Sequence, residues 1–134
     1  MKKLFFILFF SITCAFAQDD CIVLGFHQPG TQTYEGPTWC EKKSINKIIV
    51  HGPLQADQST LTGDTSVSGP IKSDHTQFDG IKITDQLTTE IVSLTNHSLV
   101  KKDLVFNGQK GTVILDKTSK VLGKIINAHV ETHQ

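Results

Sequence analysis

The sequence predicts an all-β fold, a short single-stranded β-solenoid (β-helix) of about five coils of roughly 17 residues, with a disulfide-closed N-terminal cap. Three observations lead to this prediction. A Gly-Pro pair recurs at a nearly constant step, apolar and polar residues alternate on both sides of a recurring turn, and two cysteines flank the first Gly-Pro pair. No stretch shows a convincing helical period, so we expect no helix in the domain.

The Gly-Pro pair belongs to a longer repeat. The pairs begin at positions 36, 52 and 69, so the step between them is almost constant. Residues 50–63 (VHGPLQADQSTLTG) and 67–80 (VSGPIKSDHTQFDG) align throughout, with Leu54 on Ile71 and glycine on glycine at the end. One coil of this size cannot bury its apolar edge alone. Stacking successive coils in register, as repeat proteins do, buries that edge.

Each repeat is expected to hold two short strands. In residues 50–56 apolar or small residues alternate with polar ones, Asp57-Gln58 interrupts the pattern, and residues 59–65 alternate again. This period of two is typical of strands with one buried face, separated by a turn. Lys47 stands where the later coils have glycine, so we expect the first coil to be irregular and one residue shorter.

Strands are also expected beyond residue 84, where the repeat weakens. Turn signals of the Asn-His, Asn-Gly and Asp-Lys type separate apolar segments at residues 90–94, 103–106, 111–115 and 121–126. The predicted solenoid domain therefore covers residues 34–127, and a polar C-terminal tail covers residues 128–134.

Residues 18–33 are predicted to form an N-terminal capping segment, closed by a disulfide between Cys21 and Cys40. Pairing is the default for two cysteines in an oxidising compartment. In the loop-entropy model, a closure of this length stabilises the fold by roughly 3 kcal/mol. The alternative is a reactive or metal-binding thiol pair, which the absence of a Cys-x-x-Cys spacing and of a nearby histidine pair disfavours.

Residues 1–17 have the features of a secretory signal peptide. Lys2 and Lys3 precede a short apolar stretch at residues 4–12, and Ala15-Phe16-Ala17 supplies a small-x-small cleavage site. We therefore expect an exported protein, periplasmic or secreted, with no membrane span after cleavage. The alternatives are a membrane anchor, for which the apolar stretch is short, and a lipoprotein acylated at Cys14.

The charge of the chain argues against two classes of partner. All 13 basic residues are lysines, and two of them lie in the predicted signal peptide, so 11 lysines face 13 acidic residues afterwards. With a net charge near −2 and no basic cluster, we expect neither nucleic acid nor an anionic membrane surface as a partner.

The Val-x-Gly-Pro-Leu/Ile units at residues 50–54 and 67–71, followed by residues 108–125, carry a resemblance to known proteins. They resemble short, largely uncharacterised exported β-solenoid proteins of gammaproteobacteria and, more loosely, the polymer-forming bactofilin-type β-helix. The resemblance covers about residues 34–127, and its motifs imply the fold alone. Bactofilins are cytoplasmic scaffold polymers, whereas this chain has the features of an exported one. A left-handed hexapeptide acyltransferase helix is a weaker match.

The repeat places Glu41, Asp57 and Asp74 in one column on consecutive coils. Three stacked carboxylates offer oxygen ligands to a hard cation such as Ca²⁺. We favour the alternative, in which these acids cap turns, because the Gly-Asp-rich nonapeptide of calcium-binding solenoids is absent. We therefore expect no metal and no cofactor.

The six histidines are not expected to meet across coils. His51 aligns with Ser68 and not with His75. His129 and His133 are four residues apart, a spacing that suits a metal only on a helix.

No catalytic motif is present. The chain has no Gly-x-Ser-x-Gly nucleophile context, and it lacks the arginines and long inserted loops of the large β-helix enzymes. We expect that it is not an enzyme. Tyr34, Trp39 and Phe26 are candidates for stacking on sugar rings, although we prefer a role as an apolar cover for the first coil.

The sequence therefore predicts a non-enzymatic exported structural or interaction protein. Self-association through the solenoid ends is expected, because exposed strand edges promote pairing. The alternative is a carbohydrate-binding module that uses Tyr34 and Trp39. The partner would be a second copy, or a protein or glycan of the envelope or the extracellular space.

Overall fold

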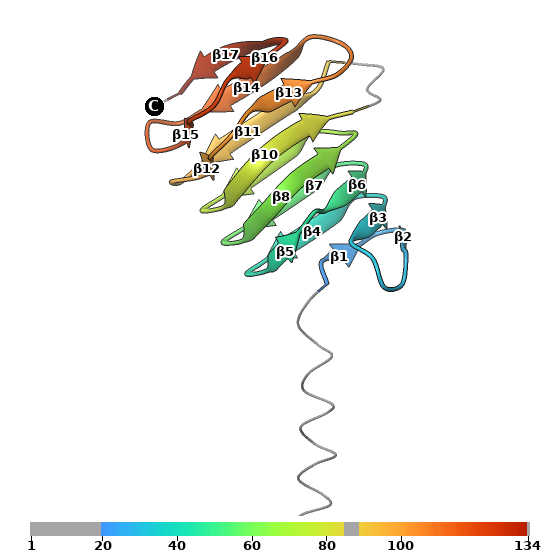
Figure 1. Ribbon diagram of the computed structural model, residues 1–134. Coiled ribbons are helices and arrows are strands. Elements are labelled where there is room, and N and C mark those ends of the chain that lie inside the picture. The colour runs from blue at the N-terminus through green and yellow to red at the C-terminus, as the bar shows by residue number, and fades with distance from the viewer. Residues whose placement is uncertain (1–19, 85–88, 134) are drawn as a thin grey trace, which may run out of the picture.

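The computed structural model describes residues 20–84 and 89–133, and over these residues the chain is all-β. It winds into a β-solenoid whose coils stack along one axis, from the N-terminal to the C-terminal end (Figure 1). The predicted fold class is confirmed. The predicted signal peptide, residues 1–17, lies outside the described residues. Within the described ranges, no helix has the length and apolar character needed to cross a membrane.

Successive coils contribute strands to two sheets. The first has the order β1-β4-β7-β9-β11-β14-β17. Its strands are β1 (Ile22–Val23), β4 (Thr38–Glu41), β7 (Leu54–Asp57), β9 (Ile71–Asp74), β11 (Ile91–Thr95), β14 (Gly111–Leu115) and β17 (Ala128–Thr132).

The second sheet has ten strands, and its main path runs β15-β12-β10-β8-β6-β3-β2. Beside this path β5 pairs with β8, and β13 pairs with β10 and β16. The strands are β2 (Phe26–His27), β3 (Thr33–Glu35), β5 (Ser44–Asn46), β6 (Ile49–His51), β8 (Thr60–Val67), β10 (Gln77–Ile83), β12 (Leu99–Val100), β13 (Leu104–Phe106), β15 (Lys120–Val121) and β16 (Ile125–Ile126).

From β3 onwards, neighbouring coils pair in parallel. Leu54 lies beside Ile71, as the repeat predicts, and Ile71 lies beside Val92. The same column continues through Val113 to Val130. Every coil therefore places equivalent residues one above another, at the ~4.8 Å spacing of neighbouring strands.

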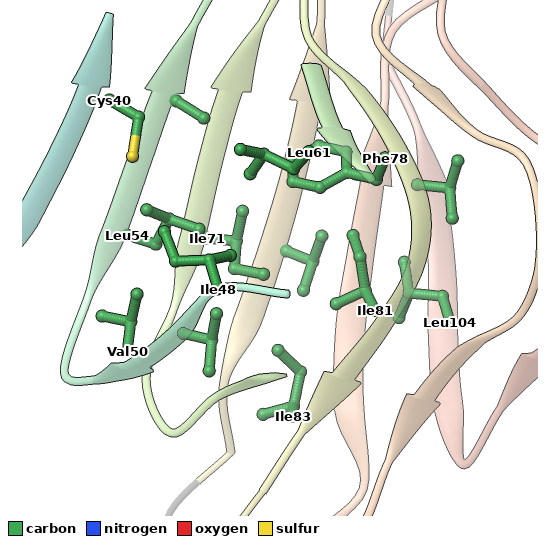
Figure 2. Close-up of a cluster of buried hydrophobic side chains, with 14 of the residues drawn as sticks. Cys40, Ile48, Val50, Leu54, Leu61, Ile71, Phe78, Ile81, Ile83 and Leu104 are labelled. Atoms are coloured by element: carbon green, nitrogen blue, oxygen red, sulfur yellow. The ribbon is translucent and has the colours of Figure 1, made fainter. Parts of the chain in front are cut away.

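The core lies between the two sheets. Leu54 and Ile71 come from the first sheet, Leu61, Phe78 and Ile81 from the second, and all five are at most 1% exposed. Figure 2 shows how these side chains converge inside the coil. The alternation of buried and exposed residues along β7 and β9 follows from the period of two, which directs every second side chain inward.

The solenoid has about six turns, one more than expected. The additional strand is β17, which pairs with β14 and occupies residues that were predicted to be a polar tail. That prediction is wrong for Ala128–Thr132, because polarity here reflects exposed side chains on an end coil and not the absence of backbone pairing.

The later coils are also longer than the repeat predicts. Along the inner column, the separation in sequence is 17 between Leu54 and Ile71 (71 − 54). It rises to 21 between Ile71 and Val92 and again between Val92 and Val113 (92 − 71 and 113 − 92). The additional positions fall between β10 and β11 and between β13 and β14, and one more falls in the corner between β11 and β12. This change of step explains why the repeat weakens beyond residue 84.

The N-terminal end is capped. There β1 pairs antiparallel with β4, and β2 pairs antiparallel with β3. The predicted disulfide joins Cys21 to Cys40, with the two Cα atoms 4.6 Å apart. It fastens the segment that precedes β3 to the first full coil.

Glycine in the Gly-Pro column is required by the close approach of consecutive coils. A Cβ atom at Gly52 would lie 2.9 Å from the carbonyl carbon of Gly36, and one at Gly69 would lie 2.7 Å from that of Gly52. Distances this short to backbone atoms leave no room for a side chain. The column therefore fixes how closely the coils stack, in addition to permitting the bend.

The corner after the first sheet is made by non-glycine residues in the left-handed conformation. Lys42, Gln58 and His75 have φ values of 54°, 50° and 50°. The amide of Gln58 donates to the carbonyl oxygen of Asp74 in the next coil at 2.8 Å. At the following corner Lys47 adopts the left-handed conformation of Gly63. The first coil is irregular here and one residue shorter than the next, as predicted, because β5 ends at Asn46 and β6 begins at Ile49, whereas β8 continues through Gly63.

A ladder of buried hydroxyls stabilises the corner after the first sheet. The amides of Ser59, Thr76 and Ser98 donate to the side-chain oxygens of Thr76, Ser98 and Ser119. The hydroxyl of Thr76 also donates to the carbonyl oxygen of Ala56 at 2.9 Å. These buried side chains are therefore committed to pairing between coils.

Candidate functional site

An open groove of about 470 Å³ crosses the outer face of the first sheet. One side is formed by the prolines of the repeat, Pro37, Pro53 and Pro70, which directly precede β4, β7 and β9. The other side is formed by Trp39, Gln55 and Lys72, which stand side by side in register on these strands. The buried residue between these columns on each strand forms the floor.

The chemistry of the groove is mainly apolar, with two polar groups along one side. The side chain of Trp39 is 37% exposed and offers an aromatic face for stacking or apolar packing. Gln55 brings an amide and Lys72 an ammonium group within the same column. Ile22 pairs with Trp39 across the antiparallel edge and is exposed, so the apolar face continues onto the cap.

Trp39 and Tyr34, the two predicted ligand-binding residues, do not lie on the same surface. Tyr34 is fully buried, and the ring of His27 stacks on its ring at a centroid distance of 4.3 Å. Its hydroxyl donates to the side-chain oxygen of Gln32 and accepts from the amide of Cys21. Burial raises the pKa of Tyr34. Tyr34 therefore has no surface for a glycan and belongs to the cap, which leaves Trp39 as the exposed candidate.

The acidic column has the predicted arrangement. Glu41, Asp57 and Asp74 lie in register on β4, β7 and β9. Asp57 accepts a hydrogen bond from Gln55, and Asp74 lies 3.2 Å from the ring nitrogen of His75. In the described part of the chain, no group of three or more metal-binding side chains has the geometry of a metal site.

The histidines differ from the expectation at one place. The rings of His75 and His97 lie on neighbouring coils with their centroids 5.5 Å apart. The prediction that no two histidines meet is therefore wrong. It assumed a constant step, whereas the longer step of this coil brings together positions that are 22 apart in the sequence (97 − 75). His129 and His133 both approach Glu131, at 3.9 and 3.4 Å.

Asp116 is an acid with a strongly shifted pKa. Its carboxylate accepts from the amide of Asn96 at 2.8 Å and from the amide and hydroxyl of Thr118. These hydrogen bonds, that from Asn96 first, lower the pKa of Asp116 from 3.8 to about 2. The carboxylate thus fixes the left-handed turn at Asn96 in the coil below.

We expect the carboxylate of Asp116 to make stability depend on pH in acid. Because its pKa is lower in the folded state, its contribution is complete above about pH 4 and is lost as the pH falls from 3.8 towards 2. Asp116→Asn should therefore be less stable at pH 7 and should lose less stability between pH 4 and pH 2. Urea unfolding at several pH values measures both effects. Asp64→Asn, at an exposed carboxylate, is the control, and an unchanged acid dependence in Asp116→Asn would contradict the assignment.

The C-terminal end of the solenoid differs from the capped end. Over the described residues β17 pairs with β14 alone, so one edge of β17 has no partner strand. Val130 continues the column of the buried Val113 but is itself exposed, as is Leu122. An inward-facing apolar residue with this exposure marks an end coil whose interior is uncovered.

Sequence reasoning identified only part of these surfaces. Gln55 and Lys72 were not singled out, although their place beside Trp39 follows from the aligned repeat. The exposed edge of β17 was missed because its residues were assigned to a tail. No family model matches the chain, and no curated protein or solved structure is significantly similar to it.

Proposed function

We propose that this chain is a non-enzymatic exported structural or interaction protein that self-associates through the C-terminal end of its solenoid. The observation that carries the proposal is the difference between the two ends. At the N-terminal end the terminal strands β1 and β2 are only two residues long and a disulfide fastens them to the first coil, whereas β17 presents a five-residue edge without a partner strand in the described part of the chain. Unprotected strand edges pair readily with other strands.

The exposed apolar residues at the C-terminal end favour contact with another protein surface over contact with water. Leu122, Ile126 and Val130 are 64%, 41% and 42% exposed and belong to the connection after β15, to β16 and to β17. Terminal coils of repeat proteins normally carry a polar outer face or a cap. A terminal coil with apolar side chains at an open edge is better explained as a contact surface.

Light scattering on the purified protein tests the proposal. We expect the molar mass to rise above that of one chain as the protein concentration increases. The experiment should be run without reducing agent, so that the disulfide-bonded cap is intact. A single-chain mass at every concentration would refute self-association.

The groove supports carbohydrate binding as a second candidate function. An exposed tryptophan beside an amide and an ammonium group is suited to stacking on a sugar ring and to hydrogen bonding with its hydroxyls. Several coils in register extend this surface along the solenoid axis, so a linear glycan fits better than a single sugar.

If the groove binds glycans, Trp39→Ala should weaken binding by about tenfold, the order expected for one lost aromatic contact. Glycan-array screening followed by calorimetry on any glycan that binds measures this. Ile49→Ala, at an exposed side chain on the other sheet, is the matched control and should bind normally. Equal affinities of wild type and Trp39→Ala would exclude the groove as the glycan site.

A further inference from the structure

The geometry of β17 points to a specific partner, a second copy of this chain. This inference rests on the proposed self-association. We propose a closed two-fold dimer in which β17 pairs antiparallel with β17 of the partner subunit, centred on Val130. The first sheet of one copy then continues into the first sheet of the other.

The backbone of β17 is arranged for such a pairing. In a parallel ladder, alternate residues make the hydrogen bonds to the neighbouring strand. On this side the carbonyl oxygen of Asn127 accepts from Gly111, and the amide of His133 donates to Leu115. By the same alternation, the backbone groups of Ala128, Val130 and Thr132 are directed to the open edge. A two-fold axis at Val130 lets the two valines exchange both N–H and C=O hydrogen bonds.

The side chains match under the same symmetry. An antiparallel pair centred on Val130 places His129 of each copy opposite Glu131 of the other copy. Each imidazole therefore faces a carboxylate. His129 and Glu131 flank Val130 on the outer face and are both exposed. Residues opposite each other at such a non-hydrogen-bonded position have closely spaced side chains. The strand is therefore self-complementary.

The apolar residues of the end coil are covered by the same arrangement. Val130 lies over the buried Val113, and Val121 and Ile125 of the second sheet are packed against the core from the same end coil. Figure 1 shows β15, β16 and β17 together at this end of the solenoid. Docking two such ends buries both sets of side chains against each other.

The cap decides between a dimer and a filament. A head-to-tail filament would need β17 to pair with the N-terminal edge, but the terminal strands there, β1 and β2, have only two residues each and cannot match the five-residue β17. Beside this cap, the side chains of Glu35 and His51 also interact with each other, with Nδ1 of His51 2.6 Å from a carboxylate oxygen of Glu35. An interface in which each copy uses the same surface closes after two subunits.

Val130→Pro tests the backbone pairing. Proline removes the N–H that would donate across the dimer axis, and it is tolerated on an edge strand whose N–H does not serve the ladder. We expect the dissociation constant of the dimer to increase at least about 30-fold, since two hydrogen bonds are lost per dimer. Val130→Ala keeps the N–H and should weaken association less. Analytical ultracentrifugation gives the dissociation constants, and circular dichroism checks that both variants are folded.

Charge reversal tests the register. His129→Glu places two acids opposite each other twice per dimer and should abolish association. The double variant His129→Glu/Glu131→Lys restores opposite charges and should restore the dimer. A pairing with any other register would not be rescued by this combination.

The outcomes separate the two levels of the proposal. A monomeric wild type refutes the proposed self-association and this dimer together. A wild type that associates while Val130→Pro associates equally well, or that grows beyond two chains, leaves self-association intact and overturns the β17 dimer. A dimeric wild type with a monomeric Val130→Pro and a rescued double variant supports it. Binding of a foreign extended peptide to β17 in preference to a second copy would also overturn it.

Discussion

Gly69→Ala is expected to destabilise the solenoid by about 3 kcal/mol, at the upper end of the range for overpacking. The new Cβ would lie 2.7 Å from the carbonyl carbon and 2.8 Å from the carbonyl oxygen of Gly52. Both are backbone atoms of the coil below, so the clash cannot be relieved by a rotamer change. The two coils would have to separate, and the hydrogen bond from Leu54 to Pro70 would be strained with them.

Gly80→Ala is the matched control. Gly80 lies in β10, its φ is outside the left-handed region, and the nearest atom to a new Cβ is 3.5 Å away, an ordinary contact. We expect a change within about 1 kcal/mol, since alanine also restricts the unfolded chain more than glycine. Urea unfolding of both variants at one protein concentration measures the difference. Similar losses in the two variants would show that the coils do not stack as closely as described.

The second large effect is expected for Phe78→Ala, which should lower the free energy of unfolding by about 3–5 kcal/mol. Phe78 is one of the largest fully buried side chains, and it lies between the sheets beside Leu61 of the preceding coil (Figure 2). Removing its ring leaves a cavity between two rigid sheets. The stacked coils cannot close this cavity without giving up their register.

Phe26→Ala provides the comparison with the same residue type. Phe26 lies on β2 in the cap and is 57% exposed, so its loss should change the free energy of unfolding by no more than about 1 kcal/mol. If Phe26→Ala destabilised the protein as much as Phe78→Ala, the assignment of Phe78 to the core would be wrong.

Much of this fold could be predicted because a solenoid repeats its environment. Leu54 and Ile71 align in the sequence since they occupy the same place in consecutive coils, and Cys40 and Ala56 align because the same interior corner is narrow. The disulfide followed from the expected compartment and not from the repeat. Where the environment repeats, the residue at one position of a coil predicts the type of residue at the equivalent position of the next coil.

The failures occurred where the environment stops repeating. The connection at residues 84–90 lengthens the step, and the corner at residues 96–98 adds one more position, which brought His75 and His97 together unexpectedly. β17 was missed although Ala128 and Val130 alternate with His129 and Glu131, because so short a segment among polar residues gives a weak strand signal. The burial of Tyr34 is an exception, because Tyr34 stands in the same inward column as the buried Val50 and Val67, and the repeat itself predicts it.

The candidate surfaces also divide into one that the repeat predicts and one that it does not. The groove column of Trp39, Gln55 and Lys72 could have been read from the aligned repeat, because register alone places these residues together. The self-complementary edge at Val130 required knowing that residues 128–132 form a strand and that the interior column passes through residue 130.

The most direct test of the stacked coils is nuclear Overhauser spectroscopy on the methyl groups of the purified protein. If the coils stack in register, Leu54 and Ile71 must show methyl contacts with each other, and Ile71 with Val92. Both pairs are far apart in the sequence, so no local structure explains such contacts. A spectrum in which Ile71 has methyl contacts only with sequence neighbours would contradict the stacked solenoid.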